Sequence, residues 1–222
     1  MTDIAERKKT TAPGFGQEAA KRITDVSLSL ALIFLLAPLL LLLWCLVRST
    51  SAGPALFRQE RVGRDRHRFT MLKLRTMYAD NDDRLHRNYV VHLLSAGQAA
   101  ATGQSGLFKL DPDPRITPLG AWLRRTSLDE LPQLFNVLRG EMSLVGPRPV
   151  LPWEAQLFGE KSQRRFLVKP GITGLWQVSG RNRLTMQEAL ELDVEYAARQ
   201  SFKLDLIIIF RTVPAILRGG GR

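Results

Sequence analysis

The residues from Val26 to Val47 form an apolar run, VSLSLALIFLLAPLLLLLWCLV, without a charged side chain. A helix of about 20 such residues is long enough to cross the roughly 30 Å hydrocarbon core of a bilayer. A cleaved secretory signal fits less well, because its apolar region usually covers about 7–15 residues and this run is longer and carries Pro38 at its middle. A membrane-embedded helix is therefore the first constraint on the fold.

The flanks of this run and its proline argue against a simple span. Both flanks are basic, with Lys21 and Arg22 before the run and Arg48 after it, and basic flanks favour the cytoplasmic side. Pro38 removes a backbone hydrogen bond and should kink or break the helix. A re-entrant segment that leaves by the face it entered satisfies both facts, although it must also satisfy the freed backbone groups. A span and a re-entrant hairpin both stay open here.

Charge and length limit the rest of the chain. With 222 residues the sequence can form one substantial core, and its formal charge of +11 indicates an anionic partner such as nucleic acid, phosphorylated substrates or an acidic membrane face. The single Cys45 excludes an intrachain disulfide framework and a cysteine-rich zinc site. Three histidines without metal-site spacing argue against a histidine-based metal site.

The periodicity of the remaining sequence predicts a mixed α/β fold. Residues 55–62 and 68–77 read as two strands joined by a turn at Gly63–Asp65. Residues 1–20 are expected to be flexible, 81–94 helical, and the rest of 78–106 a loop without recognisable chemistry. A capping box at Thr185 and Glu188 starts a helix over 185–200, and the apolar tail from 204 either fills the core or lies along the bilayer surface. Trp176 is expected in an apolar strand and in the core.

The pair Asp129–Glu130 in TSLDELPQLF has two interpretations. Ser127 and Glu130 fit the S-x-x-E capping box of a helix start, where Asp129 would lie favourably against the helix dipole. Pro132, however, falls where a helix capped at Ser127 would need a backbone donor. Because adjacent residues do not share a helical face, the carboxylates suit divided roles, one attacking and one holding a metal, better than a shared proton.

Arg148 lies between Pro147 and Pro149 in GPRP, shortly after the acidic pair. The prolines restrict its backbone toward the extended region, and a guanidinium on a stiff segment is suited to bidentate binding of phosphate oxygens. A solvated arginine in a structural turn is the alternative. Arg124, just before the pair, and Arg181, in SGRN, are further candidates for anion contacts.

Six segments together resemble one known family: KRITD before the proline-broken run, QERVG, FTMLKLRTM, RRTSLDELPQLFNVLRGEMSLVGPRP, KPGITGLWQVSGRN and DLIIIFRT. In this order and spacing the chain resembles the bacterial sugar transferases, the monotopic phosphoglycosyl transferases that begin assembly of surface glycans. The likeness runs from Lys21 to the C-terminal region and fits a small, catalytic-core-only, exopolysaccharide-initiating type. It implies a flexible segment at 1–20, a re-entrant membrane hairpin at 21–50 broken at Pro38, and a cytoplasmic catalytic domain at 51–222 with amphipathic helices on the membrane surface. Many relatives have serine before this proline, where this chain has Ala37.

The resemblance also implies a mechanism. Asp129 would attack the sugar-bearing phosphorus of a UDP-sugar, expel UMP and form a covalent aspartyl phosphosugar, which polyprenyl phosphate would then resolve. Glu130 would hold Mg²⁺, and Arg148 with its flanking prolines would bind phosphate. Arg124 and Arg181 would help to hold the nucleotide sugar.

The partners implied are a UDP-sugar, undecaprenyl phosphate and membrane lipid, with UDP-glucose or UDP-galactose as the expected donor and no nucleic acid. The implied location is the bacterial cytoplasmic (inner) membrane with the catalytic domain facing the cytoplasm; a homodimer stays open. Two alternatives are a membrane-tethered protein that docks nucleic acid or anionic lipid, recognised by salt dependence and indifference to Mg²⁺, and a phosphate ester hydrolase that would release free sugar phosphate.

Overall fold

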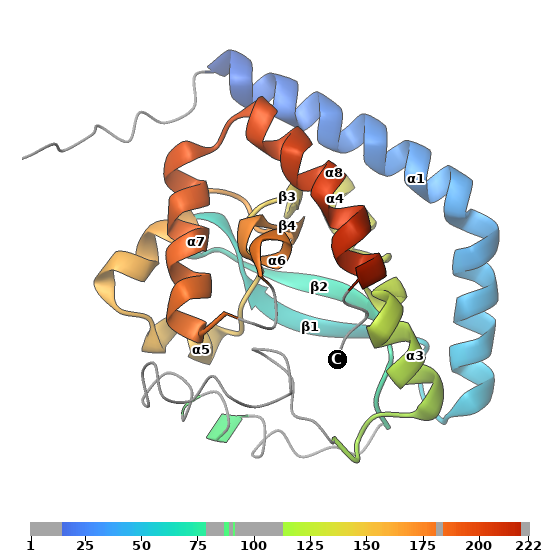
Figure 1. Ribbon diagram of the computed structural model, residues 1–222. Helices are drawn as coiled ribbons and strands as arrows, with labels where there is room; N and C mark the ends of the chain where they lie inside the picture. Colours follow the sequence, from blue (N-terminus) through green and yellow to red (C-terminus); the bar gives the residue numbers. More distant parts are fainter. Residues whose placement is uncertain (1–14, 79–86, 89–90, 92–112, 181–183, 219–222) are drawn as a thin grey trace, which may run out of the picture.

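The computed structural model describes residues 15–78, 87–88, 91, 113–180 and 184–218, and it has mixed α/β architecture. The first element, α1 (Phe15–Thr50), contains the whole apolar run and begins before the expected boundary at residue 20. It is assigned as one continuous helix with Pro38 inside it, and Figure 1 shows it bending partway along its length. A proline-induced kink explains the bend, because proline costs the helix a hydrogen bond and clashes with the preceding turn.

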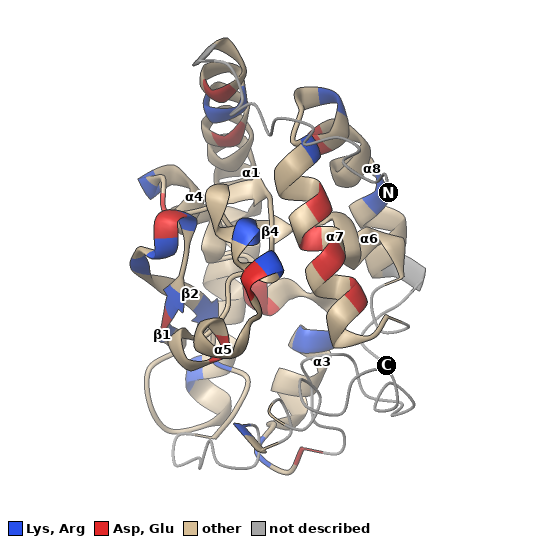
Figure 2. Ribbon diagram, turned by 90° about the vertical axis from the view of Figure 1, so that its left-hand side faces the viewer, with Lys and Arg blue, Asp and Glu red and all other residues tan. Residues whose placement is uncertain are grey.

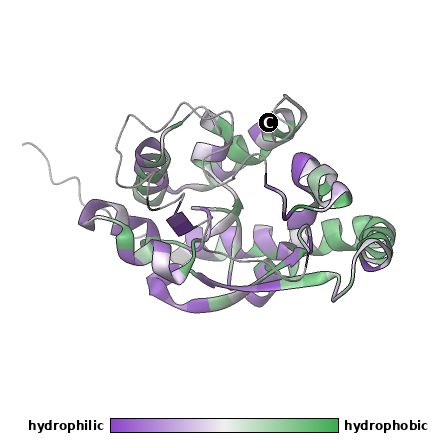
Figure 3. Ribbon diagram, turned by 90° about the horizontal axis from the view of Figure 1, so that it is seen from below, coloured by the Kyte–Doolittle hydropathy of each residue, from purple (hydrophilic) through white to green (hydrophobic). Residues whose placement is uncertain are grey.

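The helix α1 is the described element that is long and apolar enough to cross a membrane. Its hydrophobic residues are coloured green in Figure 3. Several large side chains on it are exposed, including Phe34 at 87% and Leu35 at 73%. Exposure of this extent on an apolar helix is typical of a surface that contacts lipid or another protein.

The predicted β-hairpin is confirmed. Strands β1 (Leu56–Val62) and β2 (Arg68–Leu74) pair antiparallel, with Leu56 opposite Leu74 and Val62 opposite Arg68. The turn contains the 3₁₀ helix η1 (Arg64–Arg66), in which Asp65 has φ of 53°. Basic residues lie along this hairpin, as Figure 2 shows.

A second, parallel pair of strands lies at the centre of the molecule. It consists of β3 (Ser143–Val145) and β4 (Gly171–Thr173), with Ser143 opposite Gly171. Here the backbones approach so closely that a Cβ on Gly171 would lie 2.0 Å from the Gly146 nitrogen. Only glycine permits this approach, and it brings the segment after β3 against the segment before β4.

Helices surround these strands (Figure 1). In chain order they are α3 (Pro118–Thr126), the 3₁₀ turn η3 (Leu128–Glu130), α4 (Gln133–Arg139), α5 (Pro152–Leu157), the 3₁₀ helix η4 (Glu160–Leu167), α6 (Leu175–Ser179), α7 (Met186–Arg199) and α8 (Phe202–Arg218). The capping box of α7 is confirmed, since Thr185 accepts from the Glu188 amide and Glu188 accepts from the Thr185 amide. The helix expected at 81–94 lies almost entirely outside the described residues.

The prediction for Trp176 is half right. It is 5% exposed and belongs to a core cluster with Phe158 and Phe166, as expected. The expected strand is wrong, because Trp176 lies in the short helix α6. A short apolar segment cannot be assigned by periodicity alone, and here Gly174 ends the extended segment before the tryptophan.

The apolar tail was expected either to fill the core or to lie along the bilayer surface. It forms α8, which has a buried face and an exposed apolar face. Ile208, on one face, is fully buried in the cluster that also contains Tyr196 and Val145. On other faces Phe210 is 74% exposed and Ile207 is 37% exposed. The helix therefore contributes to the core and presents an apolar surface outward.

Polar side chains attach the first part of α1 to the helices and strands that follow it. Lys21 Nζ pairs with Asp205 Oδ2 at 2.6 Å, and both side chains are largely buried. Arg22 donates to the carbonyls of Val137 and Leu138 at 2.6 and 2.7 Å. Asp25 accepts from the Leu144 amide at 3.0 Å. Since all these contacts precede or start the apolar run, they fix where α1 begins to leave the domain.

The end of α1 is attached to the same domain. Leu43 and Val47 are buried with Leu74 of the hairpin and Leu123 of α3. The Arg75 guanidinium, just after β2, donates to the Val47 carbonyl at 3.2 Å and to the Ser51 carbonyl at 2.7 Å. These bonds satisfy carbonyls at the helix C-terminus, where intrahelical donors run out. Both ends of α1 are thus bound to one body.

Candidate active site

A cavity of about 460 Å³ lies among α1, β2, η3, α6 and α8, and we refer to it as the central cavity. Four predicted site residues line it: Arg124, Asp129, Glu130 and Arg148. They come from a helix end, a 3₁₀ turn and a loop, so tertiary structure brings them together. Pro147 and Pro149 flank Arg148 in the loop without lining the cavity, and Arg181 lies outside the described residues.

The acidic pair stands on a 3₁₀ turn directly after α3. Ser127 ends that helix in the left-handed conformation, with φ of 58° and ψ of 18°. Its side chain makes no capping hydrogen bond, so the capping-box interpretation is wrong. A non-glycine residue in this conformation is uncommon and often marks a functional site. Here the sharp turn brings both Asp129 and Glu130 to the cavity wall, with Asp129 only 6% exposed.

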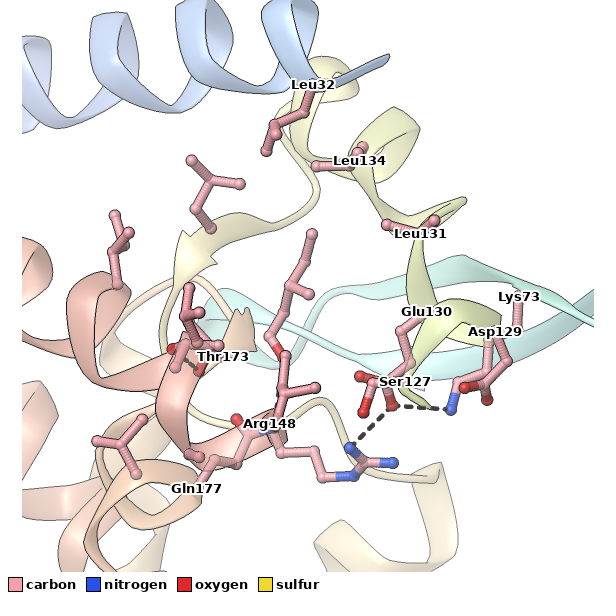
Figure 4. Close-up of a pocket in the computed structure, with 18 of the residues that line it drawn as sticks. Leu32, Lys73, Ser127, Asp129, Glu130, Leu131, Leu134, Arg148, Thr173 and Gln177 are labelled. Atoms are coloured by element: carbon pink, nitrogen blue, oxygen red, sulfur yellow. Dashed lines mark hydrogen bonds and ion pairs between the residues drawn. The ribbon is translucent and has the colours of Figure 1, made fainter. Parts of the chain in front are cut away.

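Two cations share one oxygen of Glu130. Its Oε1 lies 3.2 Å from Arg148 Nη1 and 3.4 Å from Lys73 Nζ. Figure 4 shows the arginine and the lysine approaching this carboxylate from different sides. All three side chains are mostly buried, with exposed fractions of 25% or less. The arrangement concentrates positive charge around a carboxylate, as binding of a polyanionic substrate requires.

Lys73 is a site residue that sequence reasoning missed. It lies on β2 between Leu72 and Leu74, which are both buried. Burial lowers the pKa of its ammonium below the ordinary value, while the Glu130 carboxylate opposes this shift. A lone lysine in an apolar strand was the available signal, because burial of an unpaired ammonium is costly and requires an acidic partner.

The backbone that carries Arg148 is held by three hydrogen bonds. The Pro147 carbonyl accepts from the Gly171 amide at 2.9 Å, the Arg148 carbonyl from Arg165 Nη2 at 2.6 Å, and the Pro149 carbonyl from Arg61 Nη1 at 3.4 Å. The prolines add their own restriction. The stiff segment expected from the GPRP motif is therefore supported from three directions.

The Arg165 guanidinium that holds this loop belongs to a buried ion pair. Its Nη2 lies 2.5 Å from Asp193 Oδ2 on α7, and both side chains are about 2–3% exposed. Burial raises the pKa of Asp193 to about 6, against the opposing positive charges of Arg165 and Arg148. The Arg165 guanidinium also lies over the rings of Phe158 and Phe166. The loop of Arg148 is thus connected to α7 through a buried charge pair.

Arg124, in the last turn of α3, completes the basic lining of the cavity. Burial lowers its pKa, while the nearby Asp129 carboxylate raises it. An arginine stays charged over the physiological range in spite of such a shift. Arg124 therefore supplies a positive charge next to Asp129.

Residues able to bind a divalent cation in the cavity are the two adjacent carboxylates. Within the described ranges, no group of three or more His, Cys, Asp and Glu side chains could hold a metal. Mg²⁺ characteristically binds one or two carboxylates and takes its remaining ligands from water and substrate phosphates. Glu130 fits such an open site, in which water and a phosphorylated substrate supply the remaining ligands.

Comparison with known proteins gives consistent matches. A family model described as Bacterial sugar transferase matches residues 16–219. The chain is 38% identical to the exopolysaccharide production protein ExoY of Sinorhizobium fredii over 98% of both chains. It is 39% identical to the undecaprenyl-phosphate galactose phosphotransferase of Salmonella typhimurium over 90% of this chain and 41% of that protein. It is 43% identical to the undecaprenyl-phosphate glucose phosphotransferase of Komagataeibacter xylinus over 87% of this chain and 35% of that protein.

Proposed function

The chain belongs to the bacterial sugar transferase family, and from this premise we propose that it transfers a hexose 1-phosphate from a UDP-sugar to undecaprenyl phosphate. The protein is a phosphoglycosyl transferase enzyme. The reaction releases UMP and is the first membrane step of exopolysaccharide synthesis. The observation that carries the proposal is the central cavity, where adjacent carboxylates are surrounded by Lys73, Arg124 and Arg148.

Asp129 is the proposed nucleophile. A carboxylate oxygen attacks the sugar-bearing phosphorus of the UDP-sugar, an O–P bond forms, and the bond between that phosphorus and the bridging oxygen of UMP breaks. An oxygen of the lipid phosphate then attacks the same phosphorus, and the aspartyl O–P bond breaks to regenerate the carboxylate. Burial of Asp129 supports this role, because water is kept from the intermediate.

Glu130 and the arginines are proposed to bind the diphosphate. Glu130 would hold Mg²⁺, which when bound neutralises charge that develops on the phosphate oxygens during the displacement. Arg148 on its braced loop would position phosphate bidentately, and Arg124 would supply a further positive charge. Arg181 remains a proposed contact of the nucleotide sugar.

The donor is proposed to be UDP-glucose or UDP-galactose. Two of the relatives described above are named for galactose and for glucose transfer, and each is about 40% identical to this chain. A hexose that carries an added substituent would have to be bound by the same polar side chains of the cavity, which include Thr173 and Gln177. A direct comparison of donors decides between the two sugars.

We further propose that α1 is re-entrant and that the catalytic domain lies on the cytoplasmic face of the membrane. The proposed division is a membrane hairpin at 21–50 and the catalytic domain at 51–222, whereas residues 15–20, expected to be flexible, are part of the helix α1. Attachment of both ends of α1 to one domain, through Lys21 and Arg75, supports entry and exit by one face. The bend of α1 and the basic flanks of the apolar run support the same arrangement.

The test is UMP release by purified protein in lipid, with undecaprenyl phosphate, Mg²⁺ and a panel of UDP-sugars. We expect sustained release with one hexose donor and a loss of about a thousandfold or more in Asp129→Asn. Asp65→Asn, on the exposed hairpin turn, is the matched control and should retain full activity. Undiminished release by Asp129→Asn would refute the nucleophile, and release of free sugar phosphate without acceptor would favour a hydrolase.

A further inference from the structure

The central cavity is polar at one end and aliphatic at the other. Lys73, Glu130 and Arg148 lie on one side, whereas Leu32 of α1 points in from the opposite side (Figure 4). A ligand that fills both ends must be an amphiphile with an anionic head. A soluble nucleotide sugar is polar throughout, so it would fit the charged end of the cavity and leave the aliphatic end unfilled.

One face of α1 and one face of α8 form the aliphatic walls. Leu28, Leu32 and Leu36 recur at four-residue spacing, which places them on one side of α1. Ile209, Val213 and Ile216 recur at spacings of four and three, which places them on one side of α8. These two walls contribute aliphatic side chains without an aromatic ring, so they are unsuited to stacking a nucleobase.

The polar group within the α8 wall is satisfied internally. Thr212 Oγ1 donates to the Ile208 carbonyl at 2.7 Å, and it lies 2.8 Å from Thr173 Oγ1. Since the Thr212 proton is used by the carbonyl, Thr173 donates to Thr212. The wall therefore presents no unpaired hydroxyl to a hydrocarbon ligand, which would otherwise be penalised.

The same two helices also present apolar side chains outward. Phe34 and Leu35 on α1 and Phe210 on α8 are strongly exposed and do not line the cavity. Helices with lipid-facing side chains outside and aliphatic side chains inside allow a lipid to pass between bilayer and cavity without crossing a charged surface. The aliphatic end of the cavity is thus as apolar as the outer surfaces of α1 and α8 that would face the membrane.

We infer that the groove between α1 and α8 binds the first isoprene units of the polyprenyl phosphate acceptor, with its phosphate directed to the charged end. This inference rests on the proposed function and deepens it by assigning a site to the lipid chain. The alternative is that only the phosphate contacts the protein while the whole chain stays in the bilayer. In the first arrangement, substitutions in the groove weaken acceptor binding. In the second, they leave acceptor binding unchanged.

The experiment separates the two half-reactions. UMP released in a burst without acceptor reports attack by Asp129, and turnover with acceptor reports transfer to lipid phosphate. Ile209→Trp and Leu36→Trp each fill the groove from a different helix. We expect the burst to be retained, and the KM for a long-chain polyprenyl phosphate to rise about tenfold or more. An acceptor of a single isoprene unit should be less affected, because it lacks most of the chain that the groove binds, so discrimination between the two acceptors should fall.

Ile207→Trp is the matched control, because Ile207 lies on α8 but outside the cavity lining and is 37% exposed. It should leave both half-reactions unchanged. A variant that shows no UMP burst is treated as misfolded. The test then rests on the variant in the other helix. Unchanged acceptor KM and unchanged chain-length discrimination in a variant with a normal burst would overturn the groove. Absence of a burst in the unmodified protein would instead refute the proposed function.

Discussion

Lys73 is the residue whose position gives the acidic pair its electrostatic environment. It approaches Glu130 Oε1 from β2, while Arg148 approaches the same oxygen from the loop after β3. Two cations on one carboxylate oxygen hold that carboxylate in a single orientation. They also provide charge that a bound diphosphate could share, so the proposed function gives Lys73 a part in preparing the site for its donor.

Lys73→Met should slow the UMP burst by about tenfold to a hundredfold, because a preorganised positive charge is lost from the site of phosphorus attack. Lys73→Arg should recover part of the rate, since it restores the charge with different geometry. The measurement is single-turnover UMP release without acceptor. Lys161→Met, at an exposed position of η4, is the control. An unchanged burst rate in Lys73→Met would remove the lysine from the site.

Asp193 should give the protein a specific pH dependence of stability. Burial raises its pKa to about 6, against the positive charges of Arg165 and Arg148, compared with about 3.9 for an exposed aspartate. The folded state therefore binds this proton more tightly than the unfolded chain. The stability contributed by this group is present below pH ~4 and is lost as the pH rises through about 6.

We expect the free energy of unfolding of the unmodified protein to fall by roughly 2–3 kcal/mol relative to Asp193→Asn between pH 4 and pH 6.5. Thermal unfolding in detergent across this range measures the difference. Asp65→Asn, at an exposed turn, should follow the unmodified protein at every pH. Parallel curves for Asp193→Asn and the unmodified protein would contradict the raised pKa.

Among the elements, the parallel pair β3–β4 determines where Arg148 stands. Gly146 follows β3 directly, and a Cβ there would lie 2.3 Å from the Lys169 carbonyl oxygen. The Gly171 amide, in turn, donates to the Pro147 carbonyl. One hydrogen bond therefore links this close backbone approach to the loop that carries Arg148. A short strand pair thus performs the positioning that a long rigid element performs in larger sheets.

Gly146→Ala should destabilise the protein by about 2 kcal/mol or more, because the new methyl group overlaps backbone that cannot move independently. It should also raise the KM for the UDP-sugar by displacing Arg148. Gly159→Ala is the control, since a Cβ at Gly159 meets nothing within 4 Å and its φ is −61°. Thermal unfolding and donor kinetics measure the two effects. Equal thermal stability and equal KM in Gly146→Ala and Gly159→Ala would mean that the backbone around Gly146 moves to accommodate the added methyl group.

At the scale of the whole molecule, α1 and the catalytic domain form one body. Lys21 and Asp205 join the start of α1 to α8 through a partly buried ion pair. Removal of one member of such a pair leaves an uncompensated charge, which makes these contacts strong restraints on geometry. Arg75 restrains the other end of α1 through the Val47 and Ser51 carbonyls. The helix α1 is therefore fixed at both ends to the part of the protein that contains the central cavity.

The re-entrant arrangement predicts that both ends of α1 face the cytoplasm. In a Cys45→Ser background, single cysteines at Glu18 and Ser49, both exposed, should react with a membrane-impermeant maleimide in inside-out vesicles. Neither should react in intact cells. Labelling of one of the two positions in intact cells would show that α1 spans the membrane and would refute the hairpin.

The chain's local sequence determined the features that depend on near neighbours. Two strand-like segments joined at Gly63–Asp65 predicted the hairpin, and Thr185 and Glu188 predicted the start of α7. Pro38 predicted a kink or break, and α1 bends without a break. These outcomes follow from turn, capping and proline geometry, which act over a few residues. The resemblance of the motifs identified the family for the same reason, because each motif is a short stretch of sequence.

Tertiary structure decided what distant segments do to one another. It placed Ser127 in the left-handed conformation, without the side-chain hydrogen bond that the capping box requires. It also supplied the pairings of Lys73 with Glu130 and of Arg165 with Asp193. Partners separated by tens of residues leave no local periodicity in the sequence. Their contact is instead set by the burial of charge, which has a low free energy only when the opposite charge is buried beside it.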